Sequence, residues 1–318
     1  MLSLPDFKEK QILFIKTERK TKDKIKFWNN NIKFTRDGKT INQISCHKIF
    51  AVFIIGDLSI TSEIIKKCGQ YGISIHLLDY GLERYASFAP ESEGNYLLRS
   101  VQYHSSNEND LCISKDIVSN KAINQISQFV DNDGFDTKKI INAIENAKSN
   151  KELLGIEGSL SKIYLKRVFA KMLWKRRVPR ARNDINNLLL DIGYFYLFNF
   201  TDAILRSYGF DTYKGFYHKL FYQRKSLACD IMEPFRPIID RQLVKSFNLC
   251  QINSQDFSIK NGVWQIKQGR SLKYSTIFMN AILDQKGEMH SYIKGFYRFL
   301  MRKEKRMPFY KIAKRIKK

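Results

Sequence analysis

The sequence has few of the features that stabilise secreted or very small folds. It contains only five cysteines in 318 residues, an odd number with no Cys-x-x-Cys pair. A disulfide framework or a zinc ribbon is therefore not expected. Reduced and mostly buried thiols, as found in a cytoplasm, agree best with this usage. The five are Cys46, Cys68, Cys112, Cys229 and Cys250.

Long hydrophobic runs are also missing. Residues 1–10 contain no apolar core of the kind that a signal peptide requires. The longest apolar runs cover residues 49–55 and 188–200, and the second is interrupted by Asp191 and Asn199. Both are shorter than the roughly 20 residues that a membrane-spanning helix needs. The sequence therefore predicts neither a leader peptide nor a transmembrane segment.

Acidic residues are scarce relative to basic ones. The chain has 55 Lys and Arg against 31 Asp and Glu, which gives a formal net charge of +24. Such an excess is typical of proteins that bind a polyanion, with nucleic acid as the first candidate and a membrane surface as the second. A Lys-rich proteome background accounts for part of the excess equally well, so charge alone leaves the partner open.

The chain is long enough for two domains, and its sequence pattern changes near residue 90. Residues 1–90 have the pattern of short strands, whereas residues 91–318 have mostly helical periodicity, so the predicted fold class is α+β. A polar segment at residues 105–110 is expected to form a loop. The expected strands cover residues 11–16, 49–56 and 73–79, with a hairpin over 24–33 that turns at 29–31 and a helix over 57–68.

Residues 215–240 hold the densest group of chemically active side chains. His218 lies close in sequence to Asp230 and Glu233, and a spacing of three residues places the two carboxylates on one helical face, one turn apart. Pro234 and Pro237 follow and remove helical hydrogen bonds. A helix interrupted in this way suits a bend beside a bound ion better than a purely structural element.

A second informative stretch covers residues 154–173, which carry a helical apolar stripe. Glu157 lies within it, between Gly155 and Gly158. Each glycine in a helix costs about 1 kcal/mol relative to alanine, so the two indicate that something comes close to the backbone. A solvent-facing Glu157 at a frayed helix start explains the same residues, and spacing alone does not separate the two interpretations.

Residues 174–182, WKRRVPRAR, form a dense basic segment. Runs of this kind are usually a solvated face, but beside a metal site such a run can bind phosphate groups. Three histidines elsewhere have no spacing typical of metal ligands and are expected to be ordinary core or surface residues. They are His47, His76 and His104.

Several motifs together resemble one family. They are GIEG at residues 155–158, NDINNLL at 183–189, GFYH at 215–218 and SLACDIMEPFRPIID at 226–240. With the segments at residues 54–79 and 95–103, they make the chain resemble the CRISPR-associated integrase of the adaptation step, the universal first Cas protein. The resemblance extends over about residues 49–300.

The resemblance implies a metal-dependent DNA endonuclease that inserts short DNA fragments into a CRISPR array, with a β-rich domain before a larger α-helical catalytic domain. By motif, it implies Glu157, His218 and Glu233 as ligands of Mg²⁺ or Mn²⁺. Asp230 matches a nearby acid that is functional in some relatives, and Asn187 matches a structural position. The arginines expected to contact DNA are Arg167, Arg176, Arg177, Arg180, Arg224 and Arg236.

The same resemblance implies partners and a location. Double-stranded DNA, both the inserted fragment and the CRISPR repeat, is the implied substrate. The implied assembly is a homodimer, two of which are bridged by a dimer of the small second Cas protein in a heterohexamer. The implied location is a prokaryotic cytoplasm, without membrane contact.

The residues by themselves lead to a similar chemistry. Two carboxylates and an imidazole suit Mn²⁺ or Mg²⁺, and such an ion promotes displacement at phosphorus by water or by a DNA 3′-hydroxyl. The sequence does not separate cleavage from strand transfer, because the two differ in which nucleophile the protein positions. The alternative is a non-catalytic, basic nucleic-acid-binding protein. A membrane-surface protein is less well supported, since residues 311–318 are too short for a convincing cationic helix.

Overall fold

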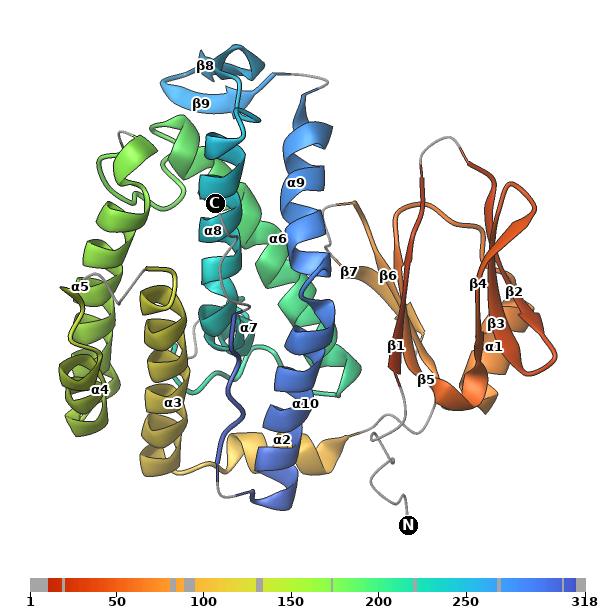
Figure 1. Ribbon diagram of the computed structural model, residues 1–318. Coiled ribbons are helices and arrows are strands. Elements are labelled where there is room, and N and C mark those ends of the chain that lie inside the picture. Colours follow the sequence, from red (N-terminus) through yellow and green to blue (C-terminus); the bar gives the residue numbers. More distant parts are fainter. Residues whose placement is uncertain are drawn as a thin grey trace. The chain divides into compact units, whose positions relative to one another are not determined.

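The computed structural model describes residues 11–18, 21–80, 84–88, 95–129, 134–172, 174–219, 222–267, 270–304 and 306–312. The chain divides into two compact units, Met1–Tyr96 and Leu97–Lys318, which we call the N-terminal domain and the helical domain. Figure 1 shows strands concentrated in the first and helices in the second. This confirms the predicted α+β class, with the two units separating after Tyr96.

The N-terminal domain contains two sheets and a helix. Its described elements are β1 (Gln11–Lys16), β2 (Asp23–Trp28), β3 (Asn31–Arg36), β4 (Lys39–Ser45), β5 (Ile49–Ile55), α1 (Ser62–Gln70), β6 (Ser74–Leu78) and β7 (Arg84–Phe88). One sheet has the order β1-β5-β6-β7, with β1, β5 and β6 parallel and β7 antiparallel to β6. The other has the order β2-β3-β4 and is antiparallel.

Two strand predictions in this domain are confirmed. β5 is an inner strand whose Val52, Phe53 and Ile54 are at most 1% exposed, and a parallel strand buried on both faces has a continuous apolar sequence. The predicted hairpin joins β2 to β3 through Asn29 and Asn30. Both asparagines have positive φ, 45° and 57°, as the favoured two-residue hairpin turn requires.

The helical domain is built around one long buried helix. Its described helices, with α2 beginning at the domain boundary, are α2 (Tyr96–Tyr103), α3 (Asn107–Ile126), α4 (Thr137–Asn146), α5 (Asn150–Val168), α6 (Ile185–Ser207), α7 (Ser226–Met232), α8 (Arg236–Asn248), α9 (Ser271–Leu283) and α10 (Lys286–Arg302). A short hairpin of β8 (Phe257–Lys260) and β9 (Val263–Ile266) precedes α9. Helix α6 packs against α7, α8, α9 and α10.

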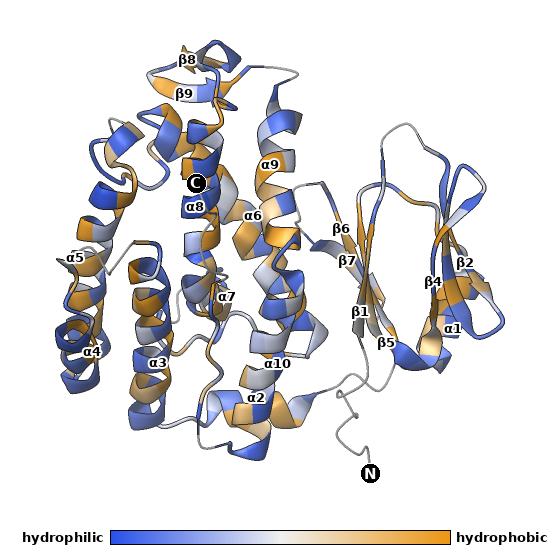
Figure 2. Cartoon of the chain, viewed as in Figure 1, coloured by the Kyte–Doolittle hydropathy of each residue, from blue (hydrophilic) through white to orange (hydrophobic). Residues whose placement is uncertain are grey.

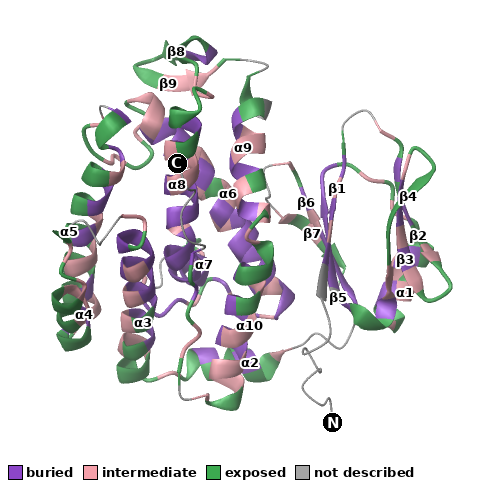
Figure 3. Cartoon of the chain, viewed as in Figure 1, coloured by how far each residue is buried: buried purple, intermediate pink, exposed green. Residues whose placement is uncertain are grey.

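The length of α6 differs from the prediction. The apolar run at residues 188–200 was expected to be too short for a membrane span. Helix α6 has 23 residues, and among the described helices it is the one whose length and composition would allow it to cross a membrane. However, 72% of its most apolar window is buried inside the protein. Figure 3 shows buried stretches on this helix, which lies between α8 and α9 in the view of Figure 1. A helix enclosed by other helices is apolar on all sides, and Figure 2 shows apolar stretches on both α6 and α9.

The loop predicted at residues 105–110 is wrong for residues 107–110, which are helical, whereas Ser105 and Ser106 lie before the helix. Helix α3 begins at Asn107, and the Ser106 hydroxyl accepts the backbone N–H of Asn109 at 3.2 Å. Glu108 and Asp110 lie in the first turn, where carboxylates interact favourably with the helix dipole. The polar residues that indicated a loop are therefore a capping segment, because unpaired N–H groups at a helix start need polar partners.

Candidate active site

Residues 215–219 and 222–225 are loop and turn, and an interrupted helix begins at Ser226. Helix α7 is followed by a 3-10 turn over Glu233–Phe235, and α8 continues from there. Pro234 lacks the N–H that an α-helical turn would use, which favours the tighter turn. Asp230 and Glu233, expected on one helical face, consequently belong to different segments and bond to different partners.

Asp230 holds the loop that carries His218. The buried carboxylate accepts the backbone N–H groups of Phe216 at 2.7 Å and Tyr217 at 3.0 Å through Oδ2. Through Oδ1 it accepts the His218 N–H at 2.9 Å and contacts His218 Nδ1 at 2.6 Å. Gly215 is required beside it, since a Cβ there would lie 2.7 Å from Asp230 Oδ2. Asp230 is thus a positioning residue that engages Nδ1, which makes Nε2 the ring nitrogen that could ligate a metal.

Glu157 lies in the middle of α5, so a frayed helix start is the wrong interpretation. Its side chain is 16% exposed, and its Oε1 accepts the Ser161 hydroxyl at 2.8 Å and the ammonium of Lys121. No described protein atom makes the close approach predicted at Gly155 and Gly158, because a Cβ at either glycine would have no atom within 4 Å. Glu157 is instead held by side chains.

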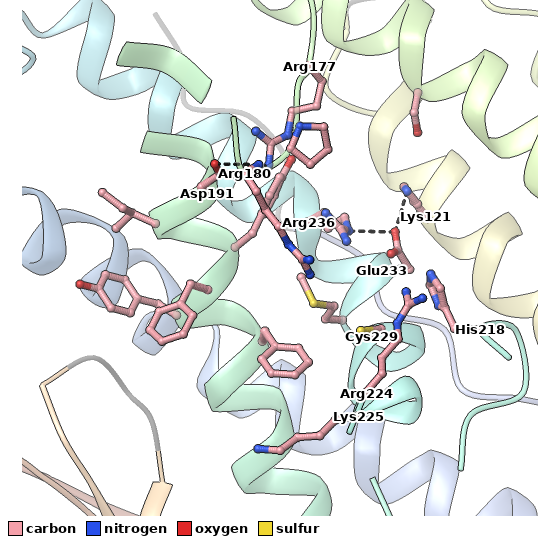
Figure 4. A pocket seen from close by; sticks show the side chains of 18 of the residues that line it. Lys121, Arg177, Arg180, Asp191, His218, Arg224, Lys225, Cys229, Glu233 and Arg236 are labelled. Carbon is pink, nitrogen blue, oxygen red and sulfur yellow. Dashed lines mark hydrogen bonds and ion pairs between the residues drawn. The ribbon is translucent and has the colours of Figure 1, made fainter. Parts of the chain in front are cut away.

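A lysine connects the two glutamates. Lys121 of α3 places its Nζ 2.6 Å from Glu233 Oε2 and forms a second ion pair with Glu157 Oε1. Arg236 Nε lies 2.9 Å from the same Glu233 oxygen. Figure 4 shows Glu233 between Lys121 and Arg236. We call Glu157, Glu233 and the bridging Lys121 the bridged acid pair, which joins α3, α5 and the turn before α8.

The neighbouring charges decide the ionisation of this cluster. Burial by itself raises the pKa of Glu233, but Arg236 and Lys121 outweigh it and hold that pKa at about 2. Burial by itself lowers the pKa of Lys121, but Glu233 and Glu157 raise it above the ordinary value for lysine. Glu233 is therefore a carboxylate and Lys121 an ammonium at neutral pH.

Lys121 was missed in the sequence, although a signal for it exists. Ile117 and Val118 on α3 are at most 1% exposed, and Lys121 follows them by four and three residues. Residues at these spacings share a helical face, so the lysine lies on the buried stripe. A lysine on an apolar stripe needs a buried counter-charge, which predicts carboxylates facing it from other segments.

The bridged acid pair lines a cavity of about 1190 Å³ in the helical domain. His218 lines the same cavity, as does Tyr222, whose side chain is 83% exposed. Besides Lys121, the cavity lining contains six basic residues, and a basic lining suits the phosphate groups of a nucleic acid. The six are Arg177, Arg180, Arg182, Arg224, Lys225 and Arg236.

The basic segment at residues 174–182 is tied to the start of α6. Arg177 forms an ion pair with Asp191 and donates to Asn187 Oδ1 at 3.0 Å. The Asn187 amide in turn donates to the backbone carbonyl of Arg176 at 2.9 Å. These contacts give Asn187 a structural role and commit Arg177 to protein partners rather than to a phosphate.

The other arginines that were expected to contact DNA fall into two groups, those that line the cavity and those that do not. Arg180 and Arg224 line the cavity, and so does Arg236, which is already paired within the acid cluster. Arg167 and Arg176 are exposed, but they lie outside the described lining. The structure therefore brings four of the six predicted arginines to one cavity, and two of those four have carboxylate partners.

The three predicted metal ligands share the lining of this cavity. Within the described residues, no group of three or more His, Cys, Asp and Glu side chains is close enough to hold a metal ion. The ammonium of Lys121 instead contacts two of the three, Glu157 and Glu233. The ligand roles of these residues and of His218 stay a prediction.

Comparison with known proteins gives consistent results for most of the chain. The family model described as "CRISPR associated protein Cas1" matches residues 19–277. The chain is 27% identical over 294 residues to "CRISPR-associated endonuclease Cas1 1" of Thermodesulfovibrio yellowstonii, covering 86% of this chain and 92% of that protein. It is 30% identical over 261 residues to "CRISPR-associated protein Cas1 3" of Methanobrevibacter ruminantium, covering 73% and 78%.

Solved structures share the fold. A chain in a "Partial Cas6-RT-Cas1–Cas2 complex" matches with a TM-score of 0.80 at 23% identity, over 96% of this chain and 100% of that chain. A "Casposase bound to integration product" matches with a TM-score of 0.74 at 20% identity, over the same shares. At these identities the likeness concerns the fold alone.

Proposed function

The chain belongs to the CRISPR associated protein Cas1 family, and from this premise we propose that it is a metal-dependent DNA integrase and endonuclease of CRISPR adaptation. The observation that carries the proposal is the convergence of Glu157, Glu233 and His218 on one basic cavity. The names of its relatives support endonuclease chemistry, and the casposase with a similar fold supports integration.

The types of donor in the cavity lining suit a divalent ion, although the described side chains are not grouped closely enough around one point to hold it as they stand. Glu157 and Glu233 each direct one oxygen at the same ammonium, so this pair already binds a cation. Among the described residues no hydrogen bond reaches the remaining oxygens, Glu157 Oε2 and Glu233 Oε1, or the Nε2 of His218. Carboxylate oxygens and one imidazole suit Mg²⁺ or Mn²⁺. When bound, such an ion polarises a phosphoryl oxygen and stabilises the leaving alkoxide.

The protein's own residues supply binding and orientation. Asp230 fixes the ring of His218, and Arg180 and Arg224 provide positive charge for phosphate groups at the cavity. In the proposed reaction the 3′-hydroxyl of a DNA fragment attacks a repeat phosphodiester. A new P–O bond forms, the old one breaks, and the hydroxyl proton is passed to the released 3′-oxygen. Water in place of the hydroxyl gives cleavage at the same site.

We propose the partners that the family resemblance implies. They are double-stranded DNA as fragment and repeat, a second copy of the chain, and the small second Cas protein, which bridges two homodimers in a heterohexamer. Support comes from the similar fold found within a Cas1–Cas2 complex. The net charge of +24 agrees with a DNA substrate, because neutralising phosphates releases counterions.

A strand-transfer assay tests the reaction. Purified protein and its small partner are incubated with Mn²⁺ or Mg²⁺, a labelled short duplex with free 3′-hydroxyls, and a supercoiled plasmid carrying a CRISPR repeat. We expect label in the plasmid only with 3′-hydroxyl ends, and none with dideoxy ends or after chelation by EDTA.

The other outcomes point to different functions. Nicking of the plasmid with either duplex, without label transfer, would identify a metal nuclease that does not integrate. DNA binding without any reaction would favour the non-catalytic nucleic-acid-binding alternative, in which Lys121 and Arg236 permanently neutralise the two glutamates.

A further inference from the structure

We propose that Lys121 is the resident cation of the acid pair. In this role it holds Glu157 and Glu233 facing one another before a divalent ion arrives, and it opposes the binding of that ion. The proposal rests on the metal site assigned under the proposed function. It adds a positioning residue on α3, which contributes none of the three predicted ligands.

The geometry shows one ammonium shared by two carboxylates from distant segments. Lys121 lies 36 residues from Glu157 and 112 residues from Glu233 in the sequence. The three side chains are 7%, 16% and 5% exposed, so little water separates or screens their charges. Without the ammonium, two carboxylates would face each other in this half-closed space, and like charges there repel strongly.

The charges of the cluster already balance without a metal. Glu157 and Glu233 contribute two negative charges, and Lys121 and Arg236 contribute two positive ones. A divalent ion therefore has to displace the ammonium of Lys121 or bind beside it against repulsion. Arg236 contacts Glu233, whereas Lys121 bridges both acids, so Lys121 is the cation that competes for the pair.

The N-terminal domain offers a matched control. Arg36 also bridges two carboxylates, those of Asp23 and Glu18, and it lies outside the described lining of the cavity. Arg36→Met and Lys121→Met each remove one cation from a two-carboxylate bridge. A general loss of folding affects both variants, but only Lys121→Met changes the charge at the proposed metal ligands.

The experiment measures Mn²⁺ affinity and metal-free stability. Free Mn²⁺ is followed by electron paramagnetic resonance in titrations of the full chain, its Lys121→Met and Arg36→Met variants, and Glu233→Gln as a ligand control. We expect Lys121→Met to bind Mn²⁺ about tenfold or more tightly than the unaltered chain, because the repelling charge is gone. Arg36→Met should bind as the unaltered chain does, and Glu233→Gln should bind more weakly.

Thermal unfolding supplies the second measurement. In EDTA, Lys121→Met should melt at a temperature lower by about 5 °C, since the acids are left without their shared partner. Added Mn²⁺ should raise its melting temperature more than that of the unaltered chain. If Lys121→Met does not fold, Lys121→Gln carries the same test, because its amide still donates a hydrogen bond without the charge.

Two results would overturn the proposal, and they are distinguishable. Unchanged or weaker Mn²⁺ binding by Lys121→Met, while Glu233→Gln still loses affinity, would leave the metal site standing and make Lys121 merely structural. Equal Mn²⁺ binding by Glu233→Gln and the unaltered chain would remove the metal site itself, and the role of Lys121 with it.

Discussion

Each of the two domains contains a cation that bridges two carboxylates. The two bridges differ in whether carboxylate oxygens are left without a hydrogen bond beside a cavity. In the N-terminal domain, Arg36 donates to both oxygens of Asp23, at 2.9 and 3.1 Å, to Glu18 and to the backbone carbonyl of Lys16. Its planar fork matches these acceptors: Asp23 lies opposite Arg36 in the β2–β3 pair, whereas Lys16 ends β1 of the other sheet and Glu18 follows it. This bridge is a structural clamp.

The bridge in the helical domain is less committed. Lys121 is a single point of charge, and one oxygen of each acid has no hydrogen bond among the described residues. These acids line a cavity together with His218, whereas the Arg36 bridge lies outside the described lining. The comparison indicates that a cation between two acids marks a candidate binding site where the acids line a cavity and keep oxygens without hydrogen bonds.

The largest expected effect is the loss of strand transfer when either acid of the bridged pair is neutralised. Glu233→Gln or Glu157→Gln should lower strand transfer by about a thousandfold or more, equivalent to about 4 kcal/mol of transition-state stabilisation, because a proposed ligand loses its charge. DNA binding should be nearly unchanged. The measurement is single-turnover label transfer, with filter binding run in parallel.

Asp23→Asn is the matched control for those variants. It should lower the melting temperature of the chain but keep strand transfer, since Asp23 belongs to the structural clamp. Full strand transfer by Glu233→Gln, or an equal loss in Asp23→Asn, would contradict the assignment of the two bridges.

A smaller effect is expected from the residue that positions His218. Asp230→Asn should lower strand transfer by about 10–100-fold, because the amide no longer offers two acceptor oxygens to the loop and to Nδ1. Asp256→Asn is a control in the same domain, since Asp256 also accepts several hydrogen bonds, from Lys273 and Tyr274. Activity of Asp230→Asn equal to that of Asp256→Asn would reduce Asp230 to a structural role.

The two domains also contrast through their histidines. His76 is 3% exposed and, among the described residues, has no hydrogen-bond partner at either ring nitrogen, whereas His218 is bonded to Asp230. Burial and the nearby Arg84 lower the pKa of His76 to about 3. The unfolded chain, with a pKa of about 6.5, therefore binds more protons between these values.

Stability should fall accordingly as the pH drops below about 6.5. At pH 5 the loss attributable to His76 should be about 2 kcal/mol relative to neutral pH. His76→Leu should remove this part of the pH dependence, as measured by urea unfolding at pH 5 and pH 7. An identical pH dependence in the variant would show that His76 is protonated in the folded state or accessible to water.

The smallest effects concern the arginines of the cavity. Arg180→Gln should weaken DNA binding and reduce the slope of log affinity against log salt by about 0.9, the value for one phosphate contact. Arg176→Gln, which removes the same charge outside the described lining, should change the slope less. Equal slopes for the two variants would mean that the cavity rim is not the DNA-binding surface.

The sequence predicted much of the fold because its signals are local. Alternation, apolar runs and paired asparagines reflect the geometry of single strands and turns, and they identified β5 and the β2–β3 hairpin. The segment at residues 105–110 was misread because capping residues and loop residues are chemically alike. The motif resemblance also singled out Glu157, His218 and Glu233, which line one cavity, and their ligand roles stay a prediction.

By itself, then, the sequence determined the two-domain α+β plan, the basic character, the family, and the candidate ligands. Only the tertiary structure decided that Asp230 anchors the loop of His218, that Arg177 is paired with Asp191, and that Lys121 bridges the two acids. The physical reason is distance along the chain. Periodicity encodes which face of a helix is buried, but a contact between residues 112 positions apart, such as Lys121 and Glu233, exists only once the helices pack.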